Sequence, residues 1–254
     1  MKPIELSIII PCYNEETRLP PTVDALLNLC KNDSFFAMTI KEILIVNDGS
    51  KDSTAKVIRG YQDKNSLVKG LGSDTNFGKG HAVRIGLQAA SSPWALVADA
   101  DMSTPWTELK SLIEQCQKSG ASIAIGSRDI KGSQITRHQS FLRENLGKSF
   151  NVFIRAITRL SFKDTQCGFK LFRMSSLLPV LPCLKLDGFA WDVEVLVFAK
   201  EFGAEIVEVP VVWEHKDDSR VNALKDGLKM LFFFFLVCLR RGFLPNHQKE
   251  IKPN

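Results

Sequence analysis

Paired cysteines and clustered histidines are missing from this sequence. Its six cysteines are scattered, and no two of them form a Cys-x-x-Cys pair: Cys12, Cys30, Cys116, Cys167, Cys183 and Cys238. The four histidines, at positions 81, 138, 215 and 247, do not share a metal-binding spacing. These absences argue against a zinc site, and they favour reduced thiols in a cytosolic compartment.

Signatures of nucleic-acid binding and of two common nucleotide folds are also missing. There is no zinc-finger spacing, no RNP-like aromatic motif and no basic zipper helix, so we expect no nucleic-acid partner. The formal net charge of +5 also suits anionic substrates or a membrane surface. The first predicted strand-to-helix turn lacks Gly-x-Gly-x-x-Gly, which argues against a dinucleotide-binding fold. Gly78-Lys79-Gly80 has neither the spacing nor the Ser/Thr of a P-loop.

The sequence has no apolar run long enough to cross a membrane. The C-terminal stretch 230–239 has ten residues without a charge, whereas a spanning helix needs about 20. At the other end, the chain enters a predicted strand at residues 6–10, so we expect no signal peptide or transmembrane helix ahead of it.

The sequence does contain a regular alternation of strand and helix patterns. Strands are predicted at residues 6–10, 43–46, 67–70, 94–98 and 122–126. Helices are predicted at 15–29, with Pro20-Pro21 marking the true first turn, at 53–61, from about 80 to 90, and at 109–118. This order predicts an α/β fold with a mostly parallel central sheet and right-handed crossovers.

The second half of the chain is less regular. A helix is expected over residues 150–160, a strand over 169–172, an amphipathic helix over 191–202 and a strand over 206–212. The 254 residues, 44% of them hydrophobic, are enough for one sizeable core. We therefore expect one domain at 1–222, followed by an interfacial helix and tail at 223–254.

Two carboxylates, Asp99 and Asp101, follow the apolar run at residues 94–98. Strand alternation places both on one side. Adjacent carboxylates repel unless a cation lies between them, and Mg²⁺ or Mn²⁺ is their natural partner, usually shared with substrate phosphates. The alternative is that they cap a helix starting at Thr104-Pro105.

Three loops are placed to meet these carboxylates at the carboxyl ends of the strands. The loops at 11–15 and 47–50 bring an aromatic ring, amides and acids that suit a nucleobase and ribose, although Asn-Asp-Gly-Ser is also a strong turn sequence. In the third, Lys79 and Arg84 lie near a helix N-terminus, where they suit a diphosphate. The alternative for that loop is a glycine-rich turn with solvated charges.

Taken together, these motifs resemble those of family 2 glycosyltransferases, which have the GT-A fold. The matching segments are Pro11-Cys-Tyr-Asn-Glu15, Val46-Asn-Asp-Gly-Ser50, Asn76-Phe-Gly-Lys-Gly80 and Ala98-Asp-Ala-Asp101. Segments 126–128, 164–172 and 191–194 resemble one branch, the dolichyl-phosphate β-glucosyltransferases and their bacterial polyprenyl-phosphate relatives. The resemblance covers roughly residues 6–220, and the nine residues from Asp164 are its most specific part.

The resemblance implies roles at the matching positions. Nucleoside contacts would come from Pro11, Tyr13, Glu15 and Asp48, and the metal, Mg²⁺ or Mn²⁺, would be held by Asp99 and Asp101. The full expected donor-binding set is Pro11, Tyr13, Glu15, Asp48, Lys79, Arg84, Asp99 and Gln166.

The same resemblance implies a catalytic set. Its members would contact phosphate, line the sugar and acceptor pocket or stand where the wider family places a catalytic acid: Asp101, Arg128, Asp164, Lys170 and Asp192. Gln166 would share that pocket. Ser103 stands where related mannosyl enzymes often have a Gln that contacts the metal, which puts a third protein ligand in doubt and favours the glucosyl branch.

Three functions fit these residues. The first is inverting transfer of glucose from UDP-glucose to a polyprenyl phosphate. The second is the same chemistry with GDP-mannose or with a glycan acceptor. The third, a nucleotide-sugar-binding module without catalysis, is disfavoured because the expected acids and Arg128 are all present. A lipid phosphate is already an anion, so Asp164 or Asp192 would position rather than deprotonate it.

The C-terminal run at 230–239 allows two interpretations. Four consecutive Phe residues point all round a helix, and Lys229 and Arg240-Arg241 flank them. This favours an interfacial helix that holds the protein peripherally on the cytoplasmic face of a membrane. The alternative is a core helix packed on the sheet.

Overall fold

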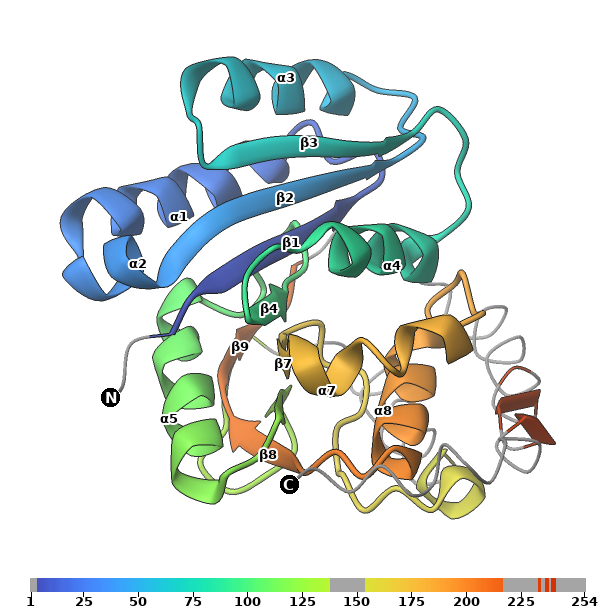
Figure 1. Ribbon diagram of the computed structural model, residues 1–254. Coiled ribbons are helices and arrows are strands. Elements are labelled where there is room, and N and C mark those ends of the chain that lie inside the picture. The colour runs from blue at the N-terminus through green and yellow to red at the C-terminus, as the bar shows by residue number, and fades with distance from the viewer. Residues whose placement is uncertain (1–3, 138–153, 217–232, 234–235, 238, 241–254) are drawn as a thin grey trace.

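A central sheet forms the middle of the molecule (Figure 1). The computed structural model describes residues 4–137, 154–216, 233, 236–237 and 239–240. The sheet contains β1 (Leu6–Cys12), β2 (Ile40–Asp48), β3 (Val68–Ser73), β4 (Trp94–Val97), β5 (Ile123–Ser127), β7 (Lys170–Arg173) and β8 (Ile206–Pro210). Their order is β3-β2-β1-β4-β7-β5-β8, and β7 runs antiparallel to both of its neighbours. A small second sheet pairs β6 (Gln134–Arg137) with β9 (Val212–Glu214).

Helices cover both faces of the central sheet. One face carries α1 (Leu19–Asn32), α2 (Ser34–Thr39), α3 (Thr54–Lys64) and α5 (Leu109–Ser119), and the other carries α4 (Lys79–Ala89), α7 (Met174–Leu177) and α8 (Trp191–Glu201). Short 3-10 turns occur at Trp106–Glu108 and Leu181–Cys183, and residues 154–158 are helical. In β1, Ile8 and Ile10 pack on the first face and Ile9 on the second. Burial on both faces explains why the parallel strands are apolar without alternation.

The strand order creates a crevice at one edge of the sheet. From β1 the chain moves outward to β2 and β3, and it then returns to place β4 on the other side of β1. Open α/β sheets bind ligands beyond the carboxyl ends of their strands at such a switch point. Because β7 is antiparallel, its first residue, Lys170, lies opposite Val97 at this same edge.

The expected α/β architecture with a mostly parallel sheet is confirmed, as are the first five strands. Helix α1 begins at Leu19 and carries the proline pair in its first turn, as predicted. Helix α5 begins at Leu109, as predicted, and a 3-10 turn at Trp106–Glu108 precedes it.

Two predictions for the second half are wrong. The strand expected over 206–212 is two strands, β8 and β9, which belong to different sheets. Helix α8 is not amphipathic, since residues 191–199 are all buried. Most of its length packs in one core cluster, and the helix becomes exposed at Lys200 in its last turn. The short elements α2, β6 and α7 were not expected.

Most of the predicted interfacial helix at 223–254 lies outside the described residues. Of those described, Val237 is fully buried, Phe233 packs against the same core, and Leu239 is about half exposed. At these positions the segment therefore packs partly as a core element. Within the described part of the chain, no helix combines the length and apolar character needed to cross a bilayer.

Candidate active site

The two metal-binding candidates, Asp99 and Asp101, lie just beyond β4 at the switch point. Asp101 accepts a hydrogen bond from the Ser103 backbone N–H through Oδ1, at 2.9 Å. Met102 lies between Asp101 and Ser103, and its φ of +51° is strained for a residue with a side chain. The loop thus holds the carboxylate of Asp101 in a turn, while the side chain of Asp99 remains 37% exposed.

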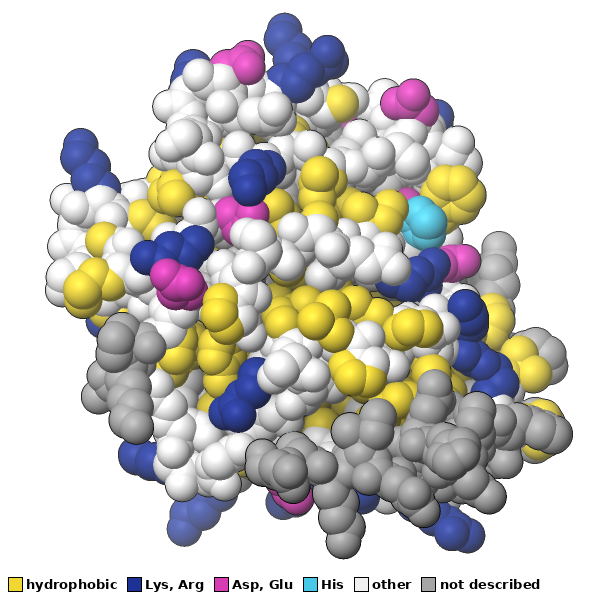
Figure 2. All heavy atoms as spheres, in the orientation of Figure 1, with side chains coloured by type: hydrophobic (Ala, Val, Ile, Leu, Met, Phe, Trp, Pro, Cys, Tyr) yellow, Lys and Arg dark blue, Asp and Glu magenta, His cyan; other side chains and the backbone are white. Residues whose placement is uncertain are grey.

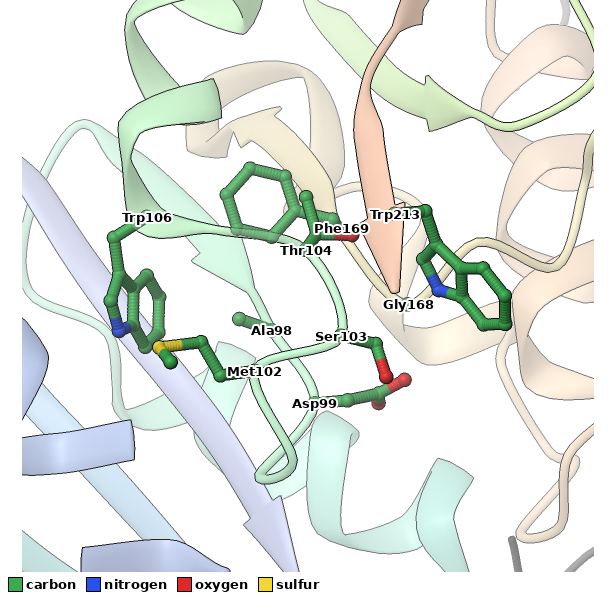
Figure 3. A pocket seen from close by; sticks show the side chains of 9 residues that line it. All are labelled: Ala98, Asp99, Met102, Ser103, Thr104, Trp106, Gly168, Phe169 and Trp213. Carbon is green, nitrogen blue, oxygen red and sulfur yellow. The ribbon is translucent and has the colours of Figure 1, made fainter. Parts of the chain in front are cut away.

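A small pocket adjoins Asp99 (Figure 3). It is lined by Ala98, Asp99, Met102, Ser103, Thr104, Trp106, Gly168, Phe169 and Trp213. Figure 3 shows the Asp99 carboxylate and the Ser103 hydroxyl on the side of the pocket that faces Trp213. A Cβ atom added at Gly168 would collide with the Asp99 carboxylate. Any larger residue at position 168 would therefore displace the Asp99 side chain from its present position.

Lys79, at the start of α4, reaches into this site. Its Nζ lies 2.5 Å from Oδ1 of Asp99, and only 17% of its side chain is exposed. Burial disfavours the charged form, but the nearby carboxylates, Asp99 foremost, raise the pKa of the Lys79 ammonium above its ordinary value. Lys79 is thus a fully charged cation resting on a predicted metal ligand.

A second ion pair joins Lys170 to Asp192, the first-turn acid of α8. Both side chains are almost fully buried, and Lys170 Nζ also donates to the Cys167 carbonyl at 2.5 Å. Burial raises the pKa of Asp192, although the ammonium groups of Lys170 and Lys79 oppose the shift. Asp192 is thus already paired with a buried cation, which suits positioning better than proton transfer.

The third ion pair joins Arg128, after β5, to Asp164. Arg128 donates twice through its guanidinium, from Nε at 2.6 Å and from Nη2 at 2.8 Å, and once through its backbone N–H at 3.0 Å. Asp164 is fully buried, and the Arg128 charge keeps the pKa of its carboxyl below the ordinary value despite that burial. The guanidinium also lies 5.2 Å from the centre of the Trp213 ring. Asp164 therefore orients Arg128 beside the pocket.

Two of the residues expected to contact the nucleoside, Asp48 and Glu15, form hydrogen bonds with other groups of the protein. Asp48 is 4% exposed, and it accepts hydrogen bonds from Asn76 and from the backbone N–H groups of Phe77 and Gly78. The Glu15 carboxylate accepts two hydrogen bonds from Arg18. Asp48 thus holds the loop before α4 in place, and Pro11 and Tyr13 remain partly exposed at the end of β1.

Arg84 does not reach the carboxylate pair. Its Nη2 lies 2.5 Å from Oδ1 of Asp187, and its Nη1 is buried without a partner among the described residues. Gln166 donates its backbone N–H to Asp164 at 3.2 Å. The structure therefore brings Lys79, Asp99, Asp101, Lys170 and Asp192 to one edge, with the Arg128–Asp164 pair beside them.

Three contributors were missed by sequence reasoning. Asp187 is separated from Arg84 by 103 positions, and no local pattern marks it. Glu194 is fully buried and accepts backbone hydrogen bonds from Lys185 and Leu186, which fixes the loop that carries Asp187. Gly168 lies inside the most specific motif, and its position there is the signal that could have identified it.

The carboxylate oxygens of Asp99 and Asp101 suit a hard divalent cation. Within the described ranges, no three metal-ligating side chains converge. A bound ion would therefore have two carboxylates from the protein and further oxygens from substrate or water, as is usual for Mg²⁺. The ammonium of Lys79 on Asp99 shows that this position accepts a cation.

Several curated proteins are similar to this chain over most of its length. The dolichyl-phosphate beta-glucosyltransferase of Dictyostelium discoideum is 34% identical over 89% of this chain and 72% of that protein. The enzyme of the same name from Drosophila melanogaster is 34% identical over 93% and 75%, and the one from Homo sapiens is 32% identical over 89% and 72%.

Solved structures share the fold at low sequence identity. Glucosyl-3-phosphoglycerate synthase from Mycobacterium tuberculosis, solved with Mn²⁺, UDP-glucose and phosphoglyceric acid, is 14% identical, with a TM-score of 0.61 over 96% of this chain and 81% of that one. Mannosyl-3-phosphoglycerate synthase from Rubrobacter xylanophilus is 17% identical, with a TM-score of 0.65 over 98% and 79%. The family model described as glycosyl transferase family 2 matches residues 7–179. This chain therefore belongs to glycosyl transferase family 2.

Proposed function

We propose that this protein transfers glucose from UDP-glucose to a polyprenyl phosphate of the dolichyl type, with inversion at the anomeric carbon. The observation that carries the proposal is the meeting of the carboxylate pair Asp99 and Asp101 with the cations Lys79, Lys170 and Arg128 at one sheet edge. Each of these cations is paired with a carboxylate, so it is together with a bound divalent cation that such a site would offer positive charge to two phosphate groups, those of the donor and of the lipid acceptor. The relatives named for this reaction, at 32–34% identity, support the choice of substrates.

The chain's own residues supply binding and orientation. A divalent cation, Mg²⁺ or Mn²⁺, held by Asp99 and Asp101 would supply Lewis-acid stabilisation of the leaving diphosphate. Arg128, held by Asp164, presents a fixed guanidinium to a phosphate oxygen. The acceptor phosphate is an anion at neutral pH and attacks without a general base. Asp192 accordingly holds Lys170 in place instead of removing a proton.

Surface chemistry supports a peripheral position on a membrane surface. On the face formed by α4 and α7, hydrophobic side chains gather in a patch with Lys and Arg at its borders (Figure 2). Phe77, just before α4, and Leu178, just after α7, are each more than half exposed. Apolar groups surrounded by cations suit an anionic bilayer surface. Flotation of the full chain with anionic vesicles tests this, and recovery only in the soluble fraction contradicts it.

The reaction is tested by incubating the full chain with Mn²⁺, dolichyl phosphate in detergent and radiolabelled UDP-glucose. Transfer of label to the organic phase is expected, with retention of the phosphate and a β-linkage by NMR. GDP-mannose is the matched control donor. Label transfer from GDP-mannose but not from UDP-glucose would overturn the donor assignment, and hydrolysis without a lipid product would overturn the acceptor assignment.

A further inference from the structure

Lys79 stands where a metal ion is expected. Its ammonium lies at hydrogen-bond distance from Asp99. The backbone on either side is anchored, because Gly78 donates its N–H to Asp48 at 2.7 Å and His81 donates to the Asp187 carbonyl at 3.2 Å. The long Lys79 side chain can therefore change direction while its backbone stays fixed.

The charges around Lys79 explain why it rests there. Asp192 already has Lys170 as its partner, whereas Asp99 has Lys79 as the cation at its carboxylate. Without Lys79, the partly exposed carboxylate of Asp99 would lack this counter-charge while Asp101 lies two positions further along the chain. A divalent ion at Asp99 would in turn lie within a few ångströms of the ammonium, and two cations at that separation repel strongly. The ion and the ammonium therefore compete for the same oxygen.

We propose that Lys79 is a displaceable counterion, which neutralises Asp99 while the donor site is empty and leaves it when the metal and the nucleotide arrive together. The diphosphate of the donor then receives the released ammonium. This inference rests on the proposed function, since it names how the same donor site keeps its charges balanced. Its consequence is that the metal binds weakly alone and much more tightly with a nucleoside diphosphate.

A permanent structural ion pair is the competing explanation. In that case removing the ammonium would lower the melting temperature, and UDP would enhance Mn²⁺ binding by the variant as much as it does for the wild type, because Lys79 never leaves Asp99. In the counterion mechanism, removing the ammonium frees Asp99 beforehand, so the affinity for Mn²⁺ without nucleotide increases and most of the enhancement by UDP is lost. The two explanations therefore predict different effects of UDP on Mn²⁺ binding by the variant.

The test measures free Mn²⁺ by electron paramagnetic resonance during titration of the full chain, with and without UDP. Lys79→Met is expected to bind Mn²⁺ alone about tenfold more tightly than the wild type, and to lose most of the enhancement by UDP. Lys79→Arg, which keeps the charge, is expected to stay near the wild type. Lys51→Met, which removes an exposed lysine at the same edge, controls for a general loss of positive charge. If the methionine variant melts early, Lys79→Gln replaces it.

The outcomes separate this inference from the proposed function. Equal or weaker Mn²⁺ binding by folded Lys79→Met or Lys79→Gln, with normal UDP and Mn²⁺ binding by the wild type, overturns the counterion role alone. Equal tightening by Lys51→Met also overturns it, because the effect would then be non-specific. A wild type that binds neither UDP nor Mn²⁺ overturns the proposed function and the counterion role with it.

Discussion

Replacing Asp164 by alanine is expected to destabilise the fold and to weaken transfer through Arg128. The Asp164 carboxylate is completely buried and accepts three hydrogen bonds from Arg128, one of them from the backbone. Its loss would leave the guanidinium without its counter-charge and the Arg128 N–H without its acceptor. Removing one partner of a buried pair costs about 3–5 kcal/mol. Because the Arg128 side chain is 24% exposed, we expect the low end, about 3 kcal/mol.

Thermal and urea unfolding measure this cost. For a chain of this size, about 3 kcal/mol corresponds to a fall of roughly 6–12 °C in melting temperature. Asp63→Ala, at an exposed position in α3, is the matched control and is expected to melt like the wild type. A double-mutant cycle with Arg128→Ala should show a coupling free energy above about 1 kcal/mol, because each residue acts through the other.

A stable but inactive variant would contradict this reasoning. If Asp164→Ala melts within about 2 °C of the wild type and yet loses glucosyl transfer, the carboxylate contacts substrate directly. Asp164 would then be a catalytic residue and not the support of Arg128. Unchanged UDP affinity is expected in either case, because the pair lies beyond the nucleotide loops, and calorimetry with UDP and Mn²⁺ measures it.

Three further substitutions test the site and the pH dependence of the fold. Asp101→Asn should abolish transfer at saturating Mn²⁺ without lowering the melting temperature, and near-wild-type turnover would refute the metal assignment. Gly168→Ala should impair Mn²⁺ and UDP binding because its Cβ collides with Asp99, whereas Gly188→Ala, with open space around it, should not. Glu42 is buried, which by itself raises its pKa, but a lysine and two serines hydrogen-bond to it and lower the pKa to about 2. A carboxylate with a lowered pKa stabilises the fold at pH values above its ordinary pKa, and this stabilisation is lost as the pH falls through the lowered pKa. Glu42→Gln should therefore cost about 2 kcal/mol at pH 7, after screening, and almost nothing near pH 2, as measured by urea unfolding.

The sheet and the site's position could be predicted because their signals are local. Continuous apolar runs ending in Asp99-Ala-Asp101 or Asn47-Asp48 mark strands and their carboxyl ends within a few residues. Parallel strands then bring those ends to one edge by geometry alone. The prediction that these loops meet the carboxylates at one edge of the sheet therefore needed no knowledge of long-range contacts.

The roles of individual residues were less predictable, because pairing is decided by contacts distant in sequence. Asp48 stands at the end of strand β2, where a ligand-binding acid is expected. In the structure it instead holds the loop before α4, 28–30 positions away. Arg84 is bound by Asp187 over a still longer separation. A motif identifies the residue types that meet at a site, whereas the partner that uses each charge emerges only from the packed structure.

The C-terminal run shows the same limit with a functional consequence. Its flanking arginines suggested contacts with lipid headgroups, but Arg240 donates to the fully buried Glu194 at 2.6 Å and to the Cys183 carbonyl. Glu194 in turn holds the backbone at 185–186, next to the aspartate that binds Arg84. A charge that the sequence assigns to the membrane surface is thus part of a continuous network that ends at Arg84 in α4. Any membrane contact by this segment would therefore either spare Arg240 or disturb the contacts that hold Asp187 against Arg84.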